Sequence, residues 1–175
     1  MSDMSIHLLT EADAEEILHF EVENRAFFEA GLGPRSEKFY SLETLKPVLA
    51  ANVIAQEAGS EFLYLIRDAA GKLVGRASLY DIEYGDLQVA EVGYRIAERS
   101  QGKGYATTAL ALILGEAFGT VGLHRVEAHT TPDNIGSQLV LIKNGFEVEG
   151  RPRGYIRVKG VWRDFLQFAK LASDG

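Results

Sequence analysis

The part of this chain that most constrains its fold is an alternating apolar segment followed by a glycine-rich loop and a helical pattern. Residues 90–97 alternate like a β-strand, with Val92, Tyr94 and Ile96 on one side. Residues 99–106 (RSQGKGYA) contain two glycines. Apolar side chains then recur at helical spacing: Ala106, Ala109, Leu110, Ile113, Leu114, Ala117 and Phe118. The sequence therefore predicts a strand–loop–helix unit with two glycines at the helix N-terminus.

A loop of this kind is suited to bind a phosphate group. The first turn of a helix leaves backbone N–H groups unpaired, and the helix dipole adds partial positive charge there. Glycine lets the backbone approach a bulky ligand closely, and Arg99 and Lys103 would add full positive charge. We therefore expect a phosphate or pyrophosphate at this helix terminus.

The common nucleotide motifs do not account for the loop. A P-loop needs Ser or Thr after Gly-Lys, whereas Gly104 follows Lys103, and a Rossmann loop needs a third glycine where Thr107 stands. The loop instead matches Gln/Arg-x-x-Gly-x-Gly/Ala, read as Gln101, Gly104 and Ala106. Here the chain resembles the GNAT superfamily of acyl-CoA-dependent N-acetyltransferases, and the resemblance implies that this loop holds the pyrophosphate of acetyl-CoA.

A second stretch strengthens the resemblance. Residues 132–137 (PDNIGS), 143–146 (KNGF) and 149–150 (EG) follow the loop in order. They are similar to the Asn-x-x-Ser … Lys-x-Gly-Phe … Glu-Gly run of the ribosomal-protein N-terminal (alanine/serine) acetyltransferase branch. The resemblance is specific from about residue 90 to residue 170 and looser before that.

The resemblance implies a coenzyme site made of strand, loop and Asn-x-x-Ser segment. The strand backbone would pair with the pantetheine arm as an extra strand does. Asn134 is also a residue type that caps helices, and the two roles are compatible. The implied coenzyme-binding residues are Tyr94, Arg95, Ile96, Gln101, Gly102, Lys103, Gly104, Tyr105, Ala106, Thr107, Asn134 and Ser137.

Acetyl transfer to an amine also needs a base and an acid. The amine attacks only when neutral, and its pKa is about 8 at a protein N-terminus or about 10.4 on lysine. Glu91 and Glu127 are the candidate catalytic bases, with His129 and Glu83 as further candidates, because they lie on or near strands that flank the expected cleft. Each is also a residue type that is commonly solvated or ion-paired.

The acid that protonates the departing thiolate is less apparent. Many GNAT enzymes have a tyrosine seven residues after the asparagine, and this chain has Leu141 there, which has no proton to give. In the branch that the chain resembles, the serine of Asn-x-x-Ser lies near the thioester sulfur. Ser137 is therefore the candidate catalytic acid, and the alternative is a solvent-facing or back-bonded serine.

Composition excludes several classes of partner, cofactor and location. The chain has 175 residues, a formal net charge of −7 and no cysteine. The charge argues against nucleic acid and anionic membranes as partners. The missing cysteine excludes a cysteine nucleophile, a thiolate metal site and disulfides, and no histidines have ligand spacing, so we expect no metal. Residues 1–5 lack a signal-peptide pattern and no apolar run reaches membrane-span length, so we expect a cytoplasmic protein.

One local feature stands out against the acidic composition. A basic run occupies the region around an expected hairpin tip at residues 158–161: Arg151, Arg153, Arg157, Lys159 and Arg163. It is either a charged surface or a site that recognises an acidic partner or the 3′-phosphate of the coenzyme.

The order of elements predicts an α/β fold in one domain, residues 1–175. The expected order, β-α-α-β-β-β-α-β-α-β-β, gives a mixed, mostly antiparallel sheet flanked by helices, and the resemblance implies the GNAT acyl-CoA N-acyltransferase fold. We expect a first helix to about residue 30 and a second segment with Ser41 as its candidate cap, in which Pro47 disturbs the first turn and residues 45–57 are helical. We also expect a helix opened by Pro132 and a last strand at 162–171.

The function expected from these features is transfer of an acetyl group from acetyl-CoA to a primary amine. The acceptor is a protein N-terminus or a small amine, attack is direct in a ternary complex, and the family suggests a possible homodimer. The alternative is a non-catalytic acyl-CoA-binding sensor or structural module, which Leu141 supports. A third hypothesis is an enzyme that uses a longer acyl group.

Overall fold

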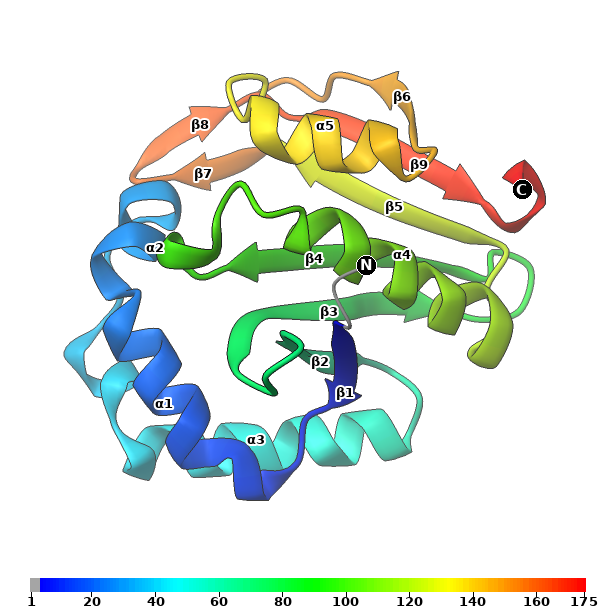
Figure 1. Ribbon diagram of the computed structural model, residues 1–175. Helices are drawn as coiled ribbons and strands as arrows, with labels where there is room; N and C mark the ends of the chain where they lie inside the picture. Colours follow the sequence, from blue (N-terminus) through cyan, green and yellow to red (C-terminus); the bar gives the residue numbers. More distant parts are fainter. Residues whose placement is uncertain (1–3) are drawn as a thin grey trace.

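A computed structural model describes residues 4–175, so residues 1–3 of the stretch considered for a signal peptide lie outside the described residues. A central sheet has the strand order β1-β2-β3-β4-β5-β9-β6 (Figure 1). Its neighbouring strands are antiparallel except β4 and β5. The strands are β1 (Ser5–Leu8), β2 (Phe62–Arg67), β3 (Leu73–Glu83), β4 (Val89–Ile96), β5 (Arg125–Thr130), β6 (Glu147–Gly150) and β9 (Leu166–Leu171). The predicted mixed, mostly antiparallel sheet is confirmed.

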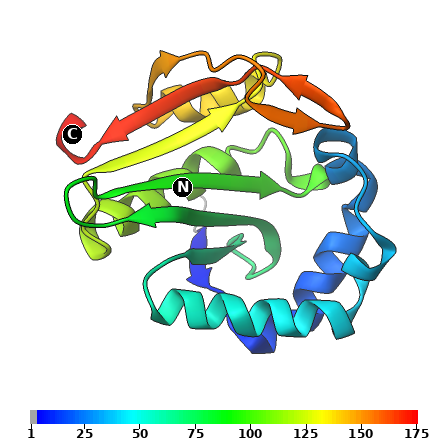
Figure 2. The ribbon, with the colours of Figure 1, turned by 180° about the vertical axis from the view of Figure 1, so that it is seen from behind.

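Helices cover both faces of this sheet. They are α1 (Ala14–Glu23), α2 (Arg25–Leu32), α3 (Leu42–Glu57), α4 (Tyr105–Gly115) and α5 (Ile135–Lys143). Tyr64 and Ile66 of β2 belong to a core cluster with α4, whereas Leu65 between them packs with residues of α1 and α3. The sheet therefore separates two apolar layers, because alternate side chains of a strand point to opposite faces. Figure 1 shows α4 and α5 in front of the central strands, and Figure 2 shows the same strands from behind.

The first predicted helix, which was expected to run to about residue 30, is two helices in the structure. A 3-10 turn (Glu11–Asp13) precedes α1, and the helix breaks at Asn24 before α2 begins. Asn24 is buried, its Nδ2 donates to the carbonyl oxygen of Phe20 at 2.9 Å, and its Oδ1 accepts from the backbone N–H of Glu98 at 3.0 Å. The Asn24 side chain thus hydrogen-bonds to the backbone of α1 and to the backbone of the segment just before the glycine loop, and it joins the two.

Two other helices begin differently from the expected ranges, although Ser41 is confirmed as the cap of α3. Helix α3 begins at Leu42, earlier than expected, and runs through Pro47. Ser41 caps it by accepting from Thr44 N–H at 3.3 Å, and Leu45 and Leu49 are buried on either side of the proline, so packing outweighs the missing hydrogen bond. Helix α5 begins at residue 135 instead of Pro132, because Asn134 provides its cap.

The predicted last strand is two strands in different sheets. Strand β8 (Val161–Arg163) pairs with β7 (Ile156–Val158) in a separate hairpin, whose tip lies at Lys159 and Gly160 as expected. The chain then enters the central sheet as β9. The interruption leaves the β7–β8 hairpin free of the central sheet, in position to reach across the molecule toward α2 (Figure 2).

Strands β4 and β5 diverge in the middle of the sheet. Their parallel pairing covers only Val89–Glu91 with Arg125–Glu127, although β5 continues to pair with β9 as far as Thr130. Within residues 4–175, the end of β4 after Glu91 therefore has no strand partner on the β5 side. In the same part of the chain, no helix is long and apolar enough to cross a membrane.

Candidate active site

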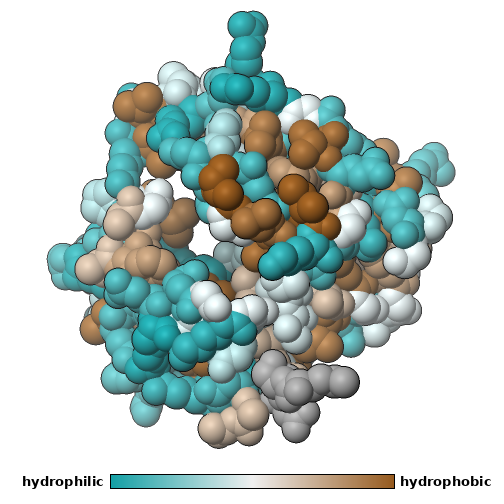
Figure 3. All heavy atoms as spheres, turned by 45° about the horizontal axis from the view of Figure 1, so that its top comes forward, coloured by the Kyte–Doolittle hydropathy of each residue, from teal (hydrophilic) through white to brown (hydrophobic). Residues whose placement is uncertain are grey.

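Two pockets meet where β4 and β5 diverge. The first, which we name the loop pocket, has a volume of about 680 Å³ and borders the glycine loop, β4 and α5. The second, the hairpin pocket, has a volume of about 750 Å³ and borders β5, the β7–β8 hairpin and the end of α2. Residues of both pockets include Leu32, Tyr94, Asn134 and Ser137. The two pockets therefore adjoin, and Figure 3 shows a hollow opening into this part of the surface.

The N-terminus of α4 is open toward the loop pocket. Gly102 and Gly104 have φ angles of 72° and 80°, and no atom lies within 4 Å of a Cβ placed on either. Gly104 precedes the helix without a side-chain cap, and Thr108 N–H makes the hydrogen bond to its carbonyl oxygen at 3.1 Å. The N–H groups of Tyr105, Ala106 and Thr107 therefore have no acceptor within the helix, which makes an anion site.

Other loop residues have more defined roles than their spacing suggested. Gln101 Nε2 donates to the carbonyl oxygen of Ile96 at 2.8 Å and so fixes the loop to the end of β4. Arg99 forms an ion pair with Glu23 and is therefore already neutralised, contrary to its expected role as added charge. Lys103 lies in the loop but is not among the residues around the loop pocket.

Arg95 can reach a ligand only through its backbone. Its side chain points to the face opposite Tyr94, donates to Glu21 at 2.5 Å and lies over the ring of Phe28. Burial lowers the pKa of Arg95 to about 10, and the charge of Glu21 acts in the other direction. The unpaired edge of β4, including Arg95 and Ile96, borders the loop pocket as predicted for backbone recognition.

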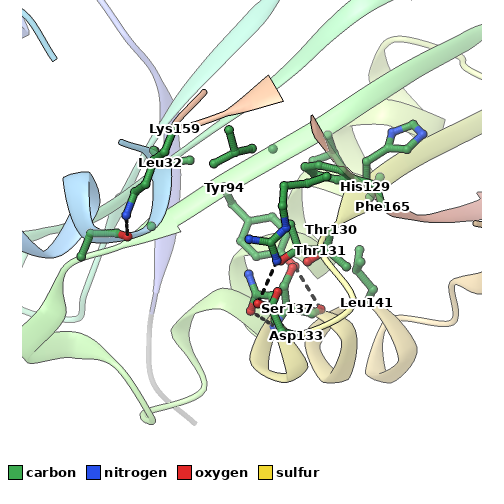
Figure 4. Close-up of a pocket in the computed structure, with 18 of the residues that line it drawn as sticks. Leu32, Tyr94, His129, Thr130, Thr131, Asp133, Ser137, Leu141, Lys159 and Phe165 are labelled. Carbon is green, nitrogen blue, oxygen red and sulfur yellow. Dashed lines mark hydrogen bonds and ion pairs between the residues drawn. The ribbon is translucent and has the colours of Figure 1, made fainter. Parts of the chain in front are cut away.

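The start of α5 brings Asn134 and Ser137 to the junction of the pockets. Asn134 Oδ1 accepts from Ser137 N–H at 3.1 Å, so the predicted cap is confirmed. Ser137 Oγ lies 3.1 Å from the hydroxyl of Tyr94, and the two share a hydrogen bond. Leu141 is buried and adds only hydrocarbon to the hairpin pocket. Figure 4 shows Tyr94, Ser137 and Leu141 together in this region.

A glutamate–histidine pair stands on the hairpin-pocket side. His129 Nδ1 lies 3.0 Å from Glu91 Oε1, and the imidazole stacks on Tyr155 with ring centroids 4.8 Å apart. Burial would raise the pKa of Glu91, but hydrogen bonds from His129 and Tyr80 outweigh it, so the pKa is lowered overall. Glu91 is thus held as a carboxylate that orients His129, and His129 borders the hairpin pocket.

The other candidate carboxylates are placed less favourably. Glu127 Oε1 accepts from Arg125 Nε at 2.7 Å, and Arg125 also binds Glu149. Neither Glu127 nor Glu83, at the end of β3, is among the residues that border the two pockets. Of the sequence candidates for the base, His129 is the one that borders a pocket, and Glu91 is the carboxylate that pairs with it.

Several residues of the site have no motif that could have found them. Tyr80 lies opposite Glu91 on β3, and burial raises its pKa. Tyr155 and Phe165 come from the flanks of the hairpin, with ring centroids 5.9 Å apart. Thr130 borders the hairpin pocket, and its buried hydroxyl has no hydrogen-bond partner among the described residues. They are recognisable only once the fold joins β3, β5 and the hairpin.

The hairpin closes over the second pocket. Lys159 Nζ donates to the carbonyl oxygen of Ala30 at 2.6 Å, joining the hairpin tip to α2 (Figure 4). Of the other basic residues, Arg163 pairs with Asp133, Arg151 with Asp164, and Arg157 with the carbonyl oxygen of Gly160. Much of the basic run therefore has a structural role at the rim of this pocket.

Metal ligands are not grouped in the part of the chain that the structure describes. Residues 4–175 contain no cluster of three or more His, Cys, Asp or Glu side chains positioned to hold an ion. The groups present at the two pockets are backbone N–H groups that can bind an anion at the start of α4, and the titratable or hydroxyl side chains of His129, Tyr94 and Ser137.

Known proteins are similar to this chain in sequence and in fold. A family model described as an acetyltransferase (GNAT) domain matches residues 4–147. A probable N-acetyltransferase of Bacillus subtilis (strain 168), YjcK, is 37% identical over 163 residues, which are 93% of this chain and 90% of the relative. The ribosomal-protein-S5-alanine acetyltransferase structure from Vibrio fischeri has a TM-score of 0.91 at 28% identity and covers 99% of this chain and 98% of that chain. Mycobacterium smegmatis RimJ, in complex with CoA-disulfide, has a TM-score of 0.90 at 27% identity, covering 98% of this chain and 83% of that chain. The resemblance predicted from the loop and from residues 132–150 is confirmed.

Proposed function

Since the chain belongs to the GNAT acetyltransferase family, we propose that it transfers an acetyl group from acetyl-CoA to a primary amine. The observation that carries this proposal is the continuity of the two pockets at Tyr94 and Ser137. One pocket has an open helix N-terminus for a pyrophosphate, and the other has a base. The whole activity would lie in one domain, residues 1–175.

In this proposal acetyl-CoA occupies the loop pocket. The pyrophosphate accepts hydrogen bonds from the N–H groups at the start of α4, where the helix dipole favours negative charge. The pantetheine arm runs along the unpaired edge of β4, as an added strand would. The thioester then lies near Tyr94 and Ser137. The RimJ complex with CoA-disulfide supports CoA as the ligand of this fold.

The acceptor amine enters through the hairpin pocket. His129, oriented by Glu91, takes a proton from the amine as it forms the new C–N bond to the thioester carbon, and the C–S bond breaks when the resulting tetrahedral intermediate collapses. Backbone N–H groups of β4 stabilise the oxygen that becomes negative in the tetrahedral intermediate. Ser137 gives a proton to the departing thiolate. As the carboxylate that assists the base, Glu91 is better supported than Glu127, because Glu91 pairs with His129 whereas Glu127 is bound to Arg125.

Within this proposal, the relatives favour a protein N-terminal amine as the acceptor. The similar structure from Vibrio fischeri is described as an acetyltransferase of ribosomal protein S5 alanine, which favours a protein N-terminal amine. The hairpin pocket, with a volume of about 750 Å³, has room for the extended N-terminus of an acceptor protein and also for a small amine. Cytoplasmic location and a homodimer stay predictions.

A second candidate function is an acyl-CoA sensor that binds without transferring the group. The observation in its favour is Leu141, which places hydrocarbon where many family members have a tyrosine hydroxyl. The His129–Glu91 pair argues for the enzyme, because binding a coenzyme does not need an oriented base.

Calorimetric titration of acetyl-CoA, with dephospho-CoA and ATP as controls, tests the coenzyme. Thiol release from acetyl-CoA is then followed with peptides that carry an N-terminal alanine and with a panel of small amines. Binding with thiol release in the presence of one acceptor class supports the enzyme. Binding without release for every amine supports the sensor, and no binding contradicts both.

A further inference from the structure

Tyr94 lies between the two pockets, and its hydroxyl is hydrogen-bonded to Ser137. It is one of the residues that border both pockets, and its hydroxyl lies 3.1 Å from Ser137 Oγ and 3.4 Å from the carbonyl oxygen of Ser137 (Figure 4). We propose that Tyr94 is the proton source for the CoA thiolate and that its proton passes through Ser137. This inference rests on the proposed function and extends it to the identity of the acid.

The chemistry of the leaving group requires such a second donor. A serine that gives its proton alone becomes an alkoxide, a far stronger base than the thiolate that it protonates. A phenol has a pKa near 10 and an alkyl thiol a pKa near 8.5, so a phenol is the better matched donor. Leu141 removes the phenol that many family members carry on the helix, and Tyr94 offers one from the neighbouring strand at the same junction.

The proposed transfer balances. As the C–S bond breaks, the sulfur takes the proton of Ser137 Oγ, and Ser137 Oγ takes the proton of the Tyr94 hydroxyl. The amine gives up one proton to His129 as the C–N bond forms. After CoA leaves, the phenolate of Tyr94 recovers a proton from solvent and His129 releases one. The net result moves one proton from the amine to the thiol.

The surroundings of Tyr94 favour a protonated phenol before reaction. Burial raises the pKa of Tyr94, and its hydrogen bond with Ser137 opposes that change. Glu91 and Arg95 on the same strand point to the opposite face, where they bind His129 and Glu21. The charged residue of α5 that borders the loop pocket is Lys143. The hydroxyl is therefore present to donate at neutral pH.

The alternative is a purely structural hydrogen bond that anchors α5 to β4. To separate the two, we compare Tyr94→Phe with Tyr64→Phe, which removes a hydroxyl from another buried tyrosine of the same sheet outside both pockets. If Tyr94 supplies the proton, Tyr94→Phe lowers kcat about 100-fold, the lower end of general acid catalysis. Its Kd for acetyl-CoA stays within about threefold, and Tyr64→Phe keeps the wild-type kcat.

Coupling with Ser137 gives a second measurement. Residues that act as one unit lose activity non-additively, so Tyr94→Phe combined with Ser137→Ala should be no slower than the slower single variant. Two independent losses that multiply would overturn the relay.

A third measurement keeps the hydroxyl and changes only its acidity. Replacing Tyr94 by 3,5-difluorotyrosine lowers the phenol pKa with little change in shape. If Tyr94 donates the proton, the alkaline limb of the kcat–pH profile moves to lower pH, which a structural hydrogen bond would not cause. An unchanged profile, or a Tyr94→Phe variant with full kcat, overturns the inference. A wild-type protein that binds no acetyl-CoA and releases no thiol contradicts the proposed function instead.

Discussion

The two pockets that meet at Tyr94 are built in different ways. The loop pocket depends on backbone, because its anion site consists of N–H groups that two glycines with positive φ leave open at the start of α4. The hairpin pocket depends on side chains from distant segments, including His129, Thr130 and Phe165, and Glu91 holds His129 through a hydrogen bond. A side-chain substitution therefore changes the hairpin pocket directly, whereas the N–H groups of the loop pocket keep their place as long as the backbone does.

The largest effect is expected from a charge placed in the loop pocket. Gly104→Asp puts a carboxylate against the pyrophosphate, and we expect the Kd for acetyl-CoA to rise at least about 100-fold, or about 2.7 kcal/mol. Gly104→Asn is the matched control, because asparagine has the same shape without the charge and tolerates a positive φ. Calorimetry on both variants separates the effect of charge from the effect of backbone strain. Equal affinities of the two variants for acetyl-CoA would show that the loop does not bind the pyrophosphate.

On the other side of the comparison, His129→Asn removes the proposed base. We expect kcat to fall about 50-fold while the Kd for acetyl-CoA is unchanged, because His129 borders only the hairpin pocket. His124→Asn, at an exposed histidine just before β5 and away from both pockets, is the control. Steady-state rates and calorimetry check this prediction. A wild-type kcat in His129→Asn would show that His129 is not the base and that the amine loses its proton to another group or to solvent.

Asn134 tests whether the capped helix also binds the coenzyme. Asn134→Asp keeps a good cap and adds a negative charge at the border of both pockets, so we expect unchanged thermal stability and about tenfold weaker acetyl-CoA binding. Asn134→Ala loses the cap and should cost about 1 kcal/mol of unfolding free energy. Thermal melts and calorimetry distinguish these outcomes, and an unaltered Kd in Asn134→Asp would confine this residue to capping.

The smallest effect concerns the pH dependence of stability. The pKa of Glu91 is lowered in the folded protein, so its contribution to folding is full above its unfolded pKa of about 4.3 and is lost as pH falls through the folded pKa. The difference in unfolding free energy between wild type and Glu91→Gln should shrink as the pH falls below about 4.3, where Glu91 becomes protonated in both states. Urea unfolding at several pH values measures it, and a constant difference down to pH 3 would contradict the pairing with His129.

Much of the fold follows from local patterns. Residues 90–118 form the predicted strand, loop and helix because alternation, glycines and helical spacing agree there. The break at Asn24 was missed because a contact between distant segments accompanies it. Asn24 bonds the backbone of Glu98, which is 74 residues away in the chain. No local pattern contains that partner.

By itself the sequence determined the open helix N-terminus, because glycine conformation and unpaired helix N–H groups are properties of a few consecutive residues. The order of elements along the chain was also enough to predict a mixed sheet. Only the tertiary structure decided which carboxylate pairs with His129, that Lys159 joins the hairpin to Ala30, and that the hydroxyl of Tyr94 meets Ser137. These contacts join segments 38 to 129 residues apart, and side-chain chemistry between such segments depends on packing that spacing along the chain does not record.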